Sequence, residues 1–436
     1  MIAKASFISA LFLAANISAA EVWTLPRAIQ FALAHNPDAR IARQRIAAAD
    51  AGLLQANSTF WPKAQLQTSY TRTDKPMLAF GSILNQRAFD SSLNFNDVPD
   101  TDDLNVRGVI TAPLYAGGRN VAERNAAKEN RRASKFEQAA VQNQLEFEVV
   151  RVFLAIQRAR QLTRSVEATA QAFASNLTLA QRRFENGTVL KADVLDIEVR
   201  LAESKEQLVQ ARNAHSLAER ALKNLLGLES SGEFLVDDSI PRLGLPGEKS
   251  SERPEFLALL HRAEAARSKV RAAKGGRLPR VNAFGSVDYD YGPITRGDGA
   301  SYAAGVVAQW DLWDGYSTRS KVSEAEANLE SVQEEARKIR LAIELEVEQA
   351  RLNLLTAKER LTATEKAVEQ AAESARLTRD RYEQGLALST QIIDAESALL
   401  GARVRRTEAE SDEQLAIAAL RKALSLPQLE ENSTSK

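Results

Sequence analysis

The chain contains one pattern of residues twice, and this duplication limits what it can fold into more than any single motif does. Two prolines recur after the same shift of 217 residues, Pro37 as Pro254 and Pro62 as Pro279. An aromatic residue followed three positions later by a glycine recurs at a shift of 198 residues, in 184–187 and 382–385. The difference of 19 residues is extra length in the first copy between Pro62 and Leu114. Two copies that differ mainly in one polar segment predict two similar structural units.

Composition removes several classes of function. Of the 436 residues, 44% are hydrophobic but only 6% are aromatic, which favours close-packed helices over cores of large side chains. The chain has no cysteine, and its three histidines are scattered, so thiolate, disulfide and histidine-cluster metal chemistry is excluded. A formal net charge of zero gives no indication of nucleic-acid binding.

The first twenty residues differ from the rest. Lys4 precedes an apolar run over 5–15, and Ser18-Ala19-Ala20 places small residues at a cleavage site. The run is too short to span a bilayer as a helix, so 1–20 is predicted to be a secretory signal peptide. The rest of the sequence has no other long apolar run, and any insertion into a membrane must therefore use β-strands.

Each copy predicts the same order of elements. In the first repeat, 21–226, a helix over 38–58 with Asn36 as its cap and Pro37 at its first position is followed by a β-hairpin, 64–115, with a polar loop over 74–103. A long helix, 119–185, and another helix, 190–226, complete the repeat. The second repeat, 254–426, has a helix, a hairpin over 280–313 and helices over 320–382 and 390–424. We expect 227–253 to be a linker in an equatorial band and 427–436 to be a disordered tail.

The length of the helices excludes a compact domain. A helix over 119–185 is about 100 Å long at 1.5 Å per residue. The two shorter helices of the copy can pair with it along nearly its whole length. Each copy then forms an up-and-down helical strut with a hairpin at one end and a glycine turn at the other.

The alternating strands have the length of tilted membrane strands. Four aromatic residues lie at the junction with the helices, as in an aromatic girdle: Trp61, Tyr115, Trp310 and Trp313. A pair of ordinary surface hairpins would show the same alternation but would not explain this girdle. Because the smallest membrane barrels have eight strands, four strands require oligomerisation. Periodicity leaves dimer, trimer and tetramer open.

The ordered, duplicated motifs resemble those of the TolC-like outer-membrane efflux proteins. They are the Asn36-Pro37 opening, the helix ends at Pro62 and Pro279, the turn 113–118, the glycine tips and 193–196. The resemblance implies an α+β membrane protein, a homotrimer with a twelve-stranded transmembrane β-barrel in the cell outer membrane continuous with a periplasmic α-helical barrel, a coiled-coil tunnel. It implies a channel of a tripartite efflux or type I secretion system, without catalytic site, metal or cofactor. The partners implied are a periplasmic adaptor (membrane fusion protein), an inner-membrane pump and outer-membrane lipid, and no nucleic acid.

The two glycine turns are the expected docking surface for the adaptor. The resemblance implies that Gly187 and Thr188 in the first copy, and Gly385 and Leu386 in the second, meet the helical hairpins of the adaptor. Glycine is also the residue that most easily reverses a chain, which alone accounts for its presence.

Residues that flank the tips are expected at the periplasmic entrance, or gate. They are Asp193, Asp196, Tyr382, Gln391 and Asp394. Threefold symmetry would turn Asp394 into a ring of three carboxylates. For Asp193 the first turn of a helix explains an acidic residue by the macrodipole alone. Ala387 stands where an arginine is expected in the family, which argues against a charge-based latch of the usual form.

Two other classes of protein remain open. A periplasmic coiled-coil scaffold or adaptor would explain the helices but not the strands, and a passive porin would explain the strands but not about 100 Å of helix. An enzyme is disfavoured because no nucleophile and base pair or phosphate loop is visible. The sequence does not distinguish drugs, metal ions and secreted proteins as substrates.

Overall fold

The computed structural model describes residues 22–94, 96–229, 234–239, 241–247 and 252–429. Its helices are α1 (Leu25–His35), α2 (Pro37–Ser58), α3 (Pro76–Asn85), α4 (Arg119–Glu185), α5 (Lys191–Leu226), α6 (Pro254–Lys274), α7 (Ser317–Glu383) and α8 (Ser389–Ala423). Its strands are β1 (Lys63–Thr73), β2 (Thr101–Ala116), β3 (Arg280–Tyr291) and β4 (Asp298–Gln309). Both α4 and α7 have 67 residues. Within the described residues no helix combines the length and the apolarity that a membrane span needs.

The chain forms two compact units that do not coincide with the two sequence repeats. We name them by their contents: the tip unit comprises Met1–Arg40, Val141–Ser251 and Ile343–Lys436, and the sheet unit comprises Ile41–Ala140 and Glu252–Ala342. Each unit takes segments from both copies, and α2, α4 and α7 contribute residues to both units. The duplicated halves are therefore interleaved in space.

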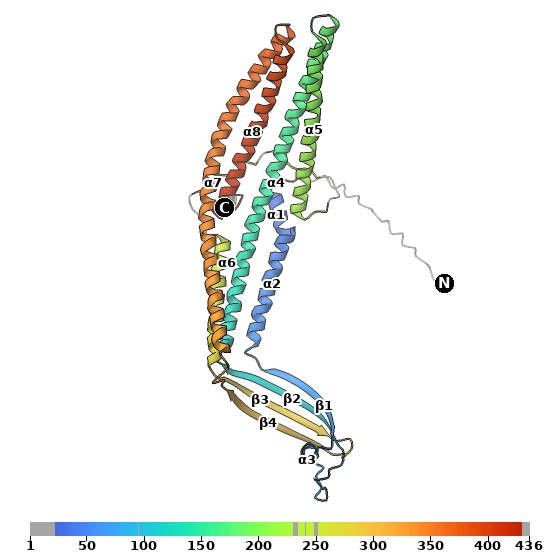
Figure 1. The fold of residues 1–436 in the computed structure, drawn as a ribbon, viewed down its shortest axis with the longest axis vertical. Coiled ribbons are helices and arrows are strands. Elements are labelled where there is room, and N and C mark those ends of the chain that lie inside the picture. Colours follow the sequence, from blue (N-terminus) through green and yellow to red (C-terminus); the bar gives the residue numbers. More distant parts are fainter. Residues whose placement is uncertain (1–21, 95, 230–233, 240, 248–251, 430–436) are drawn as a thin grey trace, which may run out of the picture. The chain divides into compact units, whose positions relative to one another are not determined.

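The sheet unit holds one four-stranded antiparallel sheet in the order β1-β2-β3-β4 (Figure 1). The central pair β2 and β3 joins the two copies, with Leu104 opposite Tyr291 and Ala112 opposite Ala283. The sheet is thus continuous across the duplication. In the part of the chain that the structure describes, β1 and β4 are edge strands with one neighbour each.

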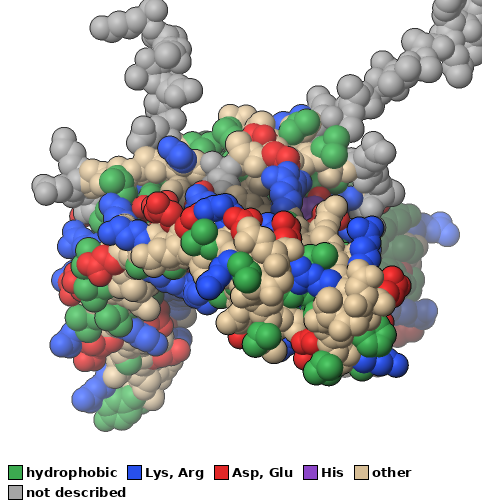
Figure 2. All heavy atoms as spheres, turned by 90° about the horizontal axis from the view of Figure 1, so that it is seen from above, with side chains coloured by type: hydrophobic (Ala, Val, Ile, Leu, Met, Phe, Trp, Pro, Cys, Tyr) green, Lys and Arg blue, Asp and Glu red, His purple; other side chains and the backbone are tan. Residues whose placement is uncertain are grey.

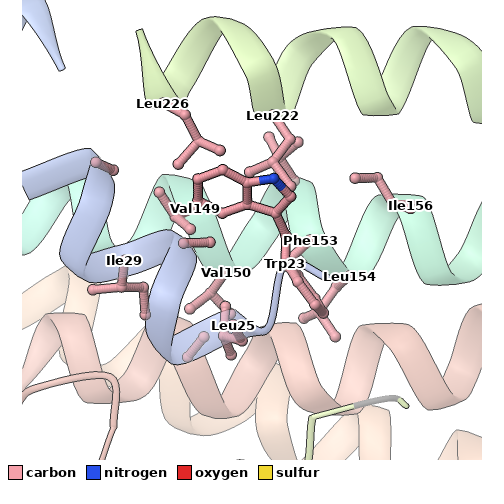
Figure 3. Packing of buried hydrophobic residues seen from close by; sticks show 14 of the residues in the cluster. Trp23, Leu25, Ile29, Val149, Val150, Phe153, Leu154, Ile156, Leu222 and Leu226 are labelled. Atoms are coloured by element: carbon pink, nitrogen blue, oxygen red, sulfur yellow. The ribbon is translucent and has the colours of Figure 1, made fainter. Parts of the chain in front are cut away.

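The largest apolar core lies in the tip unit and includes Trp23, which precedes α1. Its indole meets the ring of Phe31 edge to face, at 5.2 Å between centroids, and stacks on Phe234 at 5.6 Å. Figure 3 shows α1, α4 and α5 contributing side chains around it, among them Leu25, Ile29, Val149, Phe153, Leu222 and Leu226. Trp23 also exchanges backbone hydrogen bonds with Leu235 and Asp237. Part of the linker therefore packs against the start of the described chain.

The cap that the sequence places before α2 is confirmed. The Asn36 Oδ1 atom accepts a hydrogen bond from the backbone N–H of Asp38 at 2.7 Å, and Pro37 is the first helical residue. The Asn36 side chain also donates to the carbonyl of Leu225 at 2.8 Å. One residue therefore starts α2 and holds it to α5.

Other expectations need correction. Helix α1 was not predicted, and the polar loop over 74–103 contains the helix α3. The last strand ends at Gln309 rather than 313, because its partner β3 begins at Arg280, which lies opposite Gln309. Gln428, assigned to a disordered tail, is buried and donates to the Ala418 carbonyl. The predicted signal peptide, 1–20, and the end of the predicted tail, 430–436, lie outside the described residues.

Candidate functional site

Two tight turns of the tip unit have nearly the same backbone. The first joins α4 to α5 and the second joins α7 to α8 (Figure 1). Gly187 has φ +73° and Gly385 has φ +78°, and a Cβ atom at either position would meet open space. Backbone conformation rather than crowding therefore requires glycine. In both turns the residue after the glycine donates its N–H to a carbonyl five residues back, Thr188 to Arg183 and Leu386 to Arg381.

Asp193 and Gln391 have the same structural task at the starts of α5 and α8. The Asp193 Oδ2 atom accepts the backbone N–H of Leu190 at 3.0 Å, and the Gln391 Oε1 atom accepts that of Leu388 at 3.1 Å. Each side chain satisfies an N–H that the first helical turn leaves without a partner. Asp193 and Gln391 therefore serve the same role as helix caps, although their side chains differ in charge.

The two tips contact each other, and each contact pairs Arg183 or Ser389, which the sequence analysis did not select, with a residue of the other copy. Arg183 donates to the backbone carbonyl of Glu383 at 2.7 Å, and its guanidinium lies 5.0 Å from the centre of the Tyr382 ring. The Ser389 hydroxyl donates to the Asp193 carboxylate. One basic and one hydroxyl side chain thus join the first copy to the second.

A cavity of about 670 Å³ lies between the tips, lined by Gly187, Asp193, Tyr382, Gly385 and Ser389 among others. Tyr382 is 1% exposed, and its hydroxyl has no hydrogen-bond partner among the described residues. Burial raises the pKa of the Tyr382 phenol, the nearby Arg183 lowers this pKa, and Asp193 raises it. The phenol is therefore neutral at physiological pH.

The remaining expected gate residues lie outside this network. Asp196 and Asp394 are exposed on α5 and α8. The nearby Glu396, which was not singled out, is 3% exposed and accepts hydrogen bonds from the Arg379 guanidinium. Its counterpart in the first copy, Glu198, is exposed. Because both positions hold glutamate, the sequence could not show that one is buried and the other is not.

The tips also expose large apolar side chains. Leu190 is 73% exposed, Leu386 69% and Leu388 68%. Over the face drawn in Figure 2, basic and acidic side chains are interspersed with scattered hydrophobic ones. Leucines held in water on tight turns are typical of a protein-contact surface.

The sheet unit presents a second unusual surface. One face of the sheet exposes large apolar side chains from all four strands, among them Leu66, Tyr70, Ile110, Val287, Tyr302 and Val306. The four aromatic residues of the expected girdle are exposed at or next to the strand ends near the helices: Trp61, Tyr115, Trp310 and Trp313. An apolar face of this extent needs an apolar environment or a partner.

Nothing in the described chain has the form of a metal centre, since no group of three histidine, cysteine, aspartate or glutamate side chains converges there. The positioned groups are caps, turn residues and exposed apolar side chains. Such groups suit contact with other molecules rather than chemistry on a substrate.

Comparison with known proteins agrees with this architecture. The family model of the outer membrane efflux proteins matches residues 28–228 and 245–425. Protein CyaE of Bordetella pertussis (strain Tohama I) is 26% identical over 403 residues, which cover 87% of this chain and 79% of that protein.

Solved structures share the fold. The Campylobacter jejuni CmeC outer membrane channel matches with a TM-score of 0.80 and 16% identity, covering 93% of this chain and 87% of that one. The outer membrane protein VceC of Vibrio cholerae matches with a TM-score of 0.76 and 21% identity, covering 92% and 95%. The chain therefore belongs to the outer membrane efflux protein family, which consists of channels and not of enzymes.

Proposed function

We propose that three copies of this chain form an outer-membrane conduit of a tripartite efflux or type I secretion system. The three sheets make a twelve-stranded barrel in the outer membrane, and the long helices make a tunnel in the periplasm. Substrates pass from an inner-membrane pump and its periplasmic adaptor to the outside. Membership of the family supports the role of an outer-membrane channel. The assembly as a trimer, the twelve-stranded barrel and the two partner proteins are what we propose beyond it.

The observation that carries the proposal is the four-stranded sheet with two edge strands and an exposed apolar face. Unpaired strand edges are not tolerated in a bilayer, because their N–H and C=O groups have no water to bind. Pairing β1 of one copy with β4 of the next removes every edge. The aromatic residues at the helix ends then lie where lipid headgroups meet the hydrocarbon.

The tips supply the partner contact in this proposal. Leu190, Leu386 and Leu388 offer apolar contacts to the adaptor beside Gly187, Thr188 and Gly385. We expect Leu386→Asp to abolish export while trimer and membrane insertion persist, and Gln384→Asp, an exposed neighbour on the same turn, to leave export intact. Pull-down of the adaptor by each variant measures the contact directly; equal recovery with both variants would count against docking here.

The entrance residues belong to the same proposal. Threefold symmetry places three copies of the exposed Asp394, and three of Asp196, around one opening, whereas Asp193 and Gln391 hold the helix starts. Carboxylates gathered in this way favour divalent cations. Conductance of the purified channel in planar bilayers tests the ring: Asp394→Ala should weaken the block by divalent cations, and an unchanged block would contradict it.

The main test is disulfide cross-linking between edge strands, for which the absence of natural cysteine gives a clean background. A panel of double variants combines one cysteine within 64–70 of β1 with one within 302–308 of β4. Oxidation of outer membranes should give covalent dimers and trimers in denaturing gels.

The matched control pairs Gly108→Cys with Val287→Cys, which face each other within one chain. This pair should form a disulfide without increasing the mass. Edge pairs that never cross-link between chains, while the control pair oxidises, would refute the barrel. Release of the protein from membranes by carbonate would instead favour the periplasmic scaffold.

A further inference from the structure

The 19 additional residues of the first copy place an apolar helix, α3, on one face of the sheet. The face is identified by the register: Ser69 lies opposite Asn105, Asn105 opposite Asp290, and Asp290 opposite Gly299. Side chains at these positions point to the polar side of the sheet, away from Leu66 and Tyr70. In the proposed barrel the polar side lines the channel.

Three glycines of the second hairpin form the seat of α3. A Cβ atom at Gly292 would lie 2.1 Å from the Gln86 Oε1 atom, one at Gly297 would lie 2.6 Å from the Gln86 carbonyl oxygen, and one at Gly299 would lie 2.0 Å from the Asn85 carbonyl oxygen. Gly299 lies in β4 on the polar side, and Gly292 and Gly297 lie in the loop that joins β3 to β4. Glycine here allows the end of α3 to approach the backbone closely.

Polar contacts fix the seat. Gln86 is fully buried, and its Nε2 atom donates to the Asp102 carbonyl at 2.7 Å and to the Asp103 carboxylate at 3.0 Å. The Thr295 hydroxyl donates to the Oε1 atom of Gln86. Arg87 adopts φ +54°, an unfavourable conformation for a residue with a side chain, and ends the helix. The extra segment of the first copy is therefore clamped onto the loop of the second.

Two opposite faces of α3 are apolar. Ala79 and Ile83 are buried, whereas Met77 is 82% exposed, Leu78 54% and Leu84 44%. Met77 and Leu84 lie two turns apart on one side of the helix, roughly opposite Ala79 and Ile83. The face with Ala79 and Ile83 is covered within the chain. The face with Met77 and Leu84 has no partner among the described residues.

We propose that the free faces of three α3 helices, centred on Met77, Leu78 and Leu84, meet around the channel axis and form an apolar seal at the outer mouth. The inference rests on the trimeric barrel proposed above. A twelve-stranded barrel has a backbone radius of about 12 Å. A helix about 10 Å wide on its inner side therefore reaches the axis. The partner of each free face is then the same helix of the other two copies.

Cross-linking tests the contact in the full-length protein. With Met77→Cys as the single cysteine, a short bismaleimide added to intact cells should give covalent dimers of the chain. Ile294→Cys, exposed in the second hairpin loop and outside the free face, should stay monomeric. Failure of Met77→Cys to cross-link, with edge strands that do cross-link, overturns the seal and leaves the barrel intact. Failure of both removes the barrel itself.

Accessibility tests the seal separately from the periplasmic entrance. Gln67→Cys reports from the polar side of β1, and a bulky, membrane-impermeant maleimide is applied to intact cells. Adding Met77→Ser and Leu84→Ser should raise the labelling rate at least tenfold, whereas adding Ile294→Ser should leave it unchanged. Equal labelling in all three backgrounds would show that α3 does not close the mouth.

Discussion

The two tips are related by duplication, yet two side chains that flank the second turn are buried while their counterparts beside the first turn are exposed. Tyr382 is 1% exposed, whereas its counterpart Phe184 is 44% exposed. Glu396 is 3% exposed and bound to Arg379, whereas its counterpart Glu198 is exposed. Nearly identical turns therefore have different surroundings. The comparison shows that the helix ends beside the second turn carry more of the packing of the tip unit, while both turns keep large apolar side chains exposed.

The largest effect is expected from Arg379→Ala. Removing the guanidinium leaves the Glu396 carboxylate buried without its counter-charge, which costs about 2–3 kcal/mol after allowing for the 42% exposure of Arg379. The matched change in the first copy, Gln181→Ala, should stay within about 0.5 kcal/mol. Hydrogen exchange of amides in 375–400 and 177–202 measures both. Restoration of protection by Arg379→Ala combined with Glu396→Leu would confirm the cause, and equal protection in both single variants would contradict the comparison.

An intermediate effect is expected from the helix caps. Asp193→Ala removes a charged cap and the bond from Ser389, which together cost about 1–2 kcal/mol. Gln391→Ala removes only a neutral cap and should cost about 0.5–1 kcal/mol. Urea unfolding of the purified protein, monitored by a fluorophore attached at each tip, measures the loss of stability in each variant and shows which loss is larger. A larger loss for Gln391→Ala would mean that the link between the copies contributes nothing.

The smallest effect concerns the Tyr382 hydroxyl. Because this hydroxyl is buried without a partner among the described residues, Tyr382→Phe should stabilise the tip unit by about 1 kcal/mol or less. The raised pKa favours the neutral phenol in the folded state, so native stability should fall as pH rises above the ordinary value of 10.0, and this fall should be absent in the variant. Phe184→Tyr, on the exposed tip, should change neither quantity. Destabilisation by Tyr382→Phe would reveal a partner for the hydroxyl in the assembled protein.

Local sequence patterns predicted the long helices, the strands and the cap at Asn36. They are set by hydrophobic period and by residues such as Pro37, whose effect is felt within one turn. Helix α1 was not predicted although Leu25, Ala28, Ile29 and Ala32 follow helical spacing, because it is short and the strongest helix-start signal, Pro37, belongs to the next helix. Helix α3 was missed because the loop around it is rich in polar residues, although 76–85 is apolar.

The arrangement of the tips could not have been predicted in the same way. The contacts of Arg183 with Glu383 and of Ser389 with Asp193 join residues about 200 positions apart. The residue types alone do not distinguish the buried Glu396 from the exposed Glu198. These differences in burial depend on how the segments of the two copies pack against each other. Two copies with the same local pattern can be distinguished only when their mutual packing is known.

The pairing of β2 with β3 also sets the order in which the protein can fold. Lys63 and Thr111, partners in the first hairpin, are 48 residues apart, whereas Leu104 and Tyr291, partners in the central ladder, are 187 residues apart. Closing the longer loop costs about 1 kcal/mol more in chain entropy, and such distant contacts form slowly. When the N-terminal half is made first, β2 keeps one unpaired edge until β3 arrives, and an exposed edge invites aggregation. The two halves must therefore pair late, and the free edge of β2 stays open to aggregation until they do.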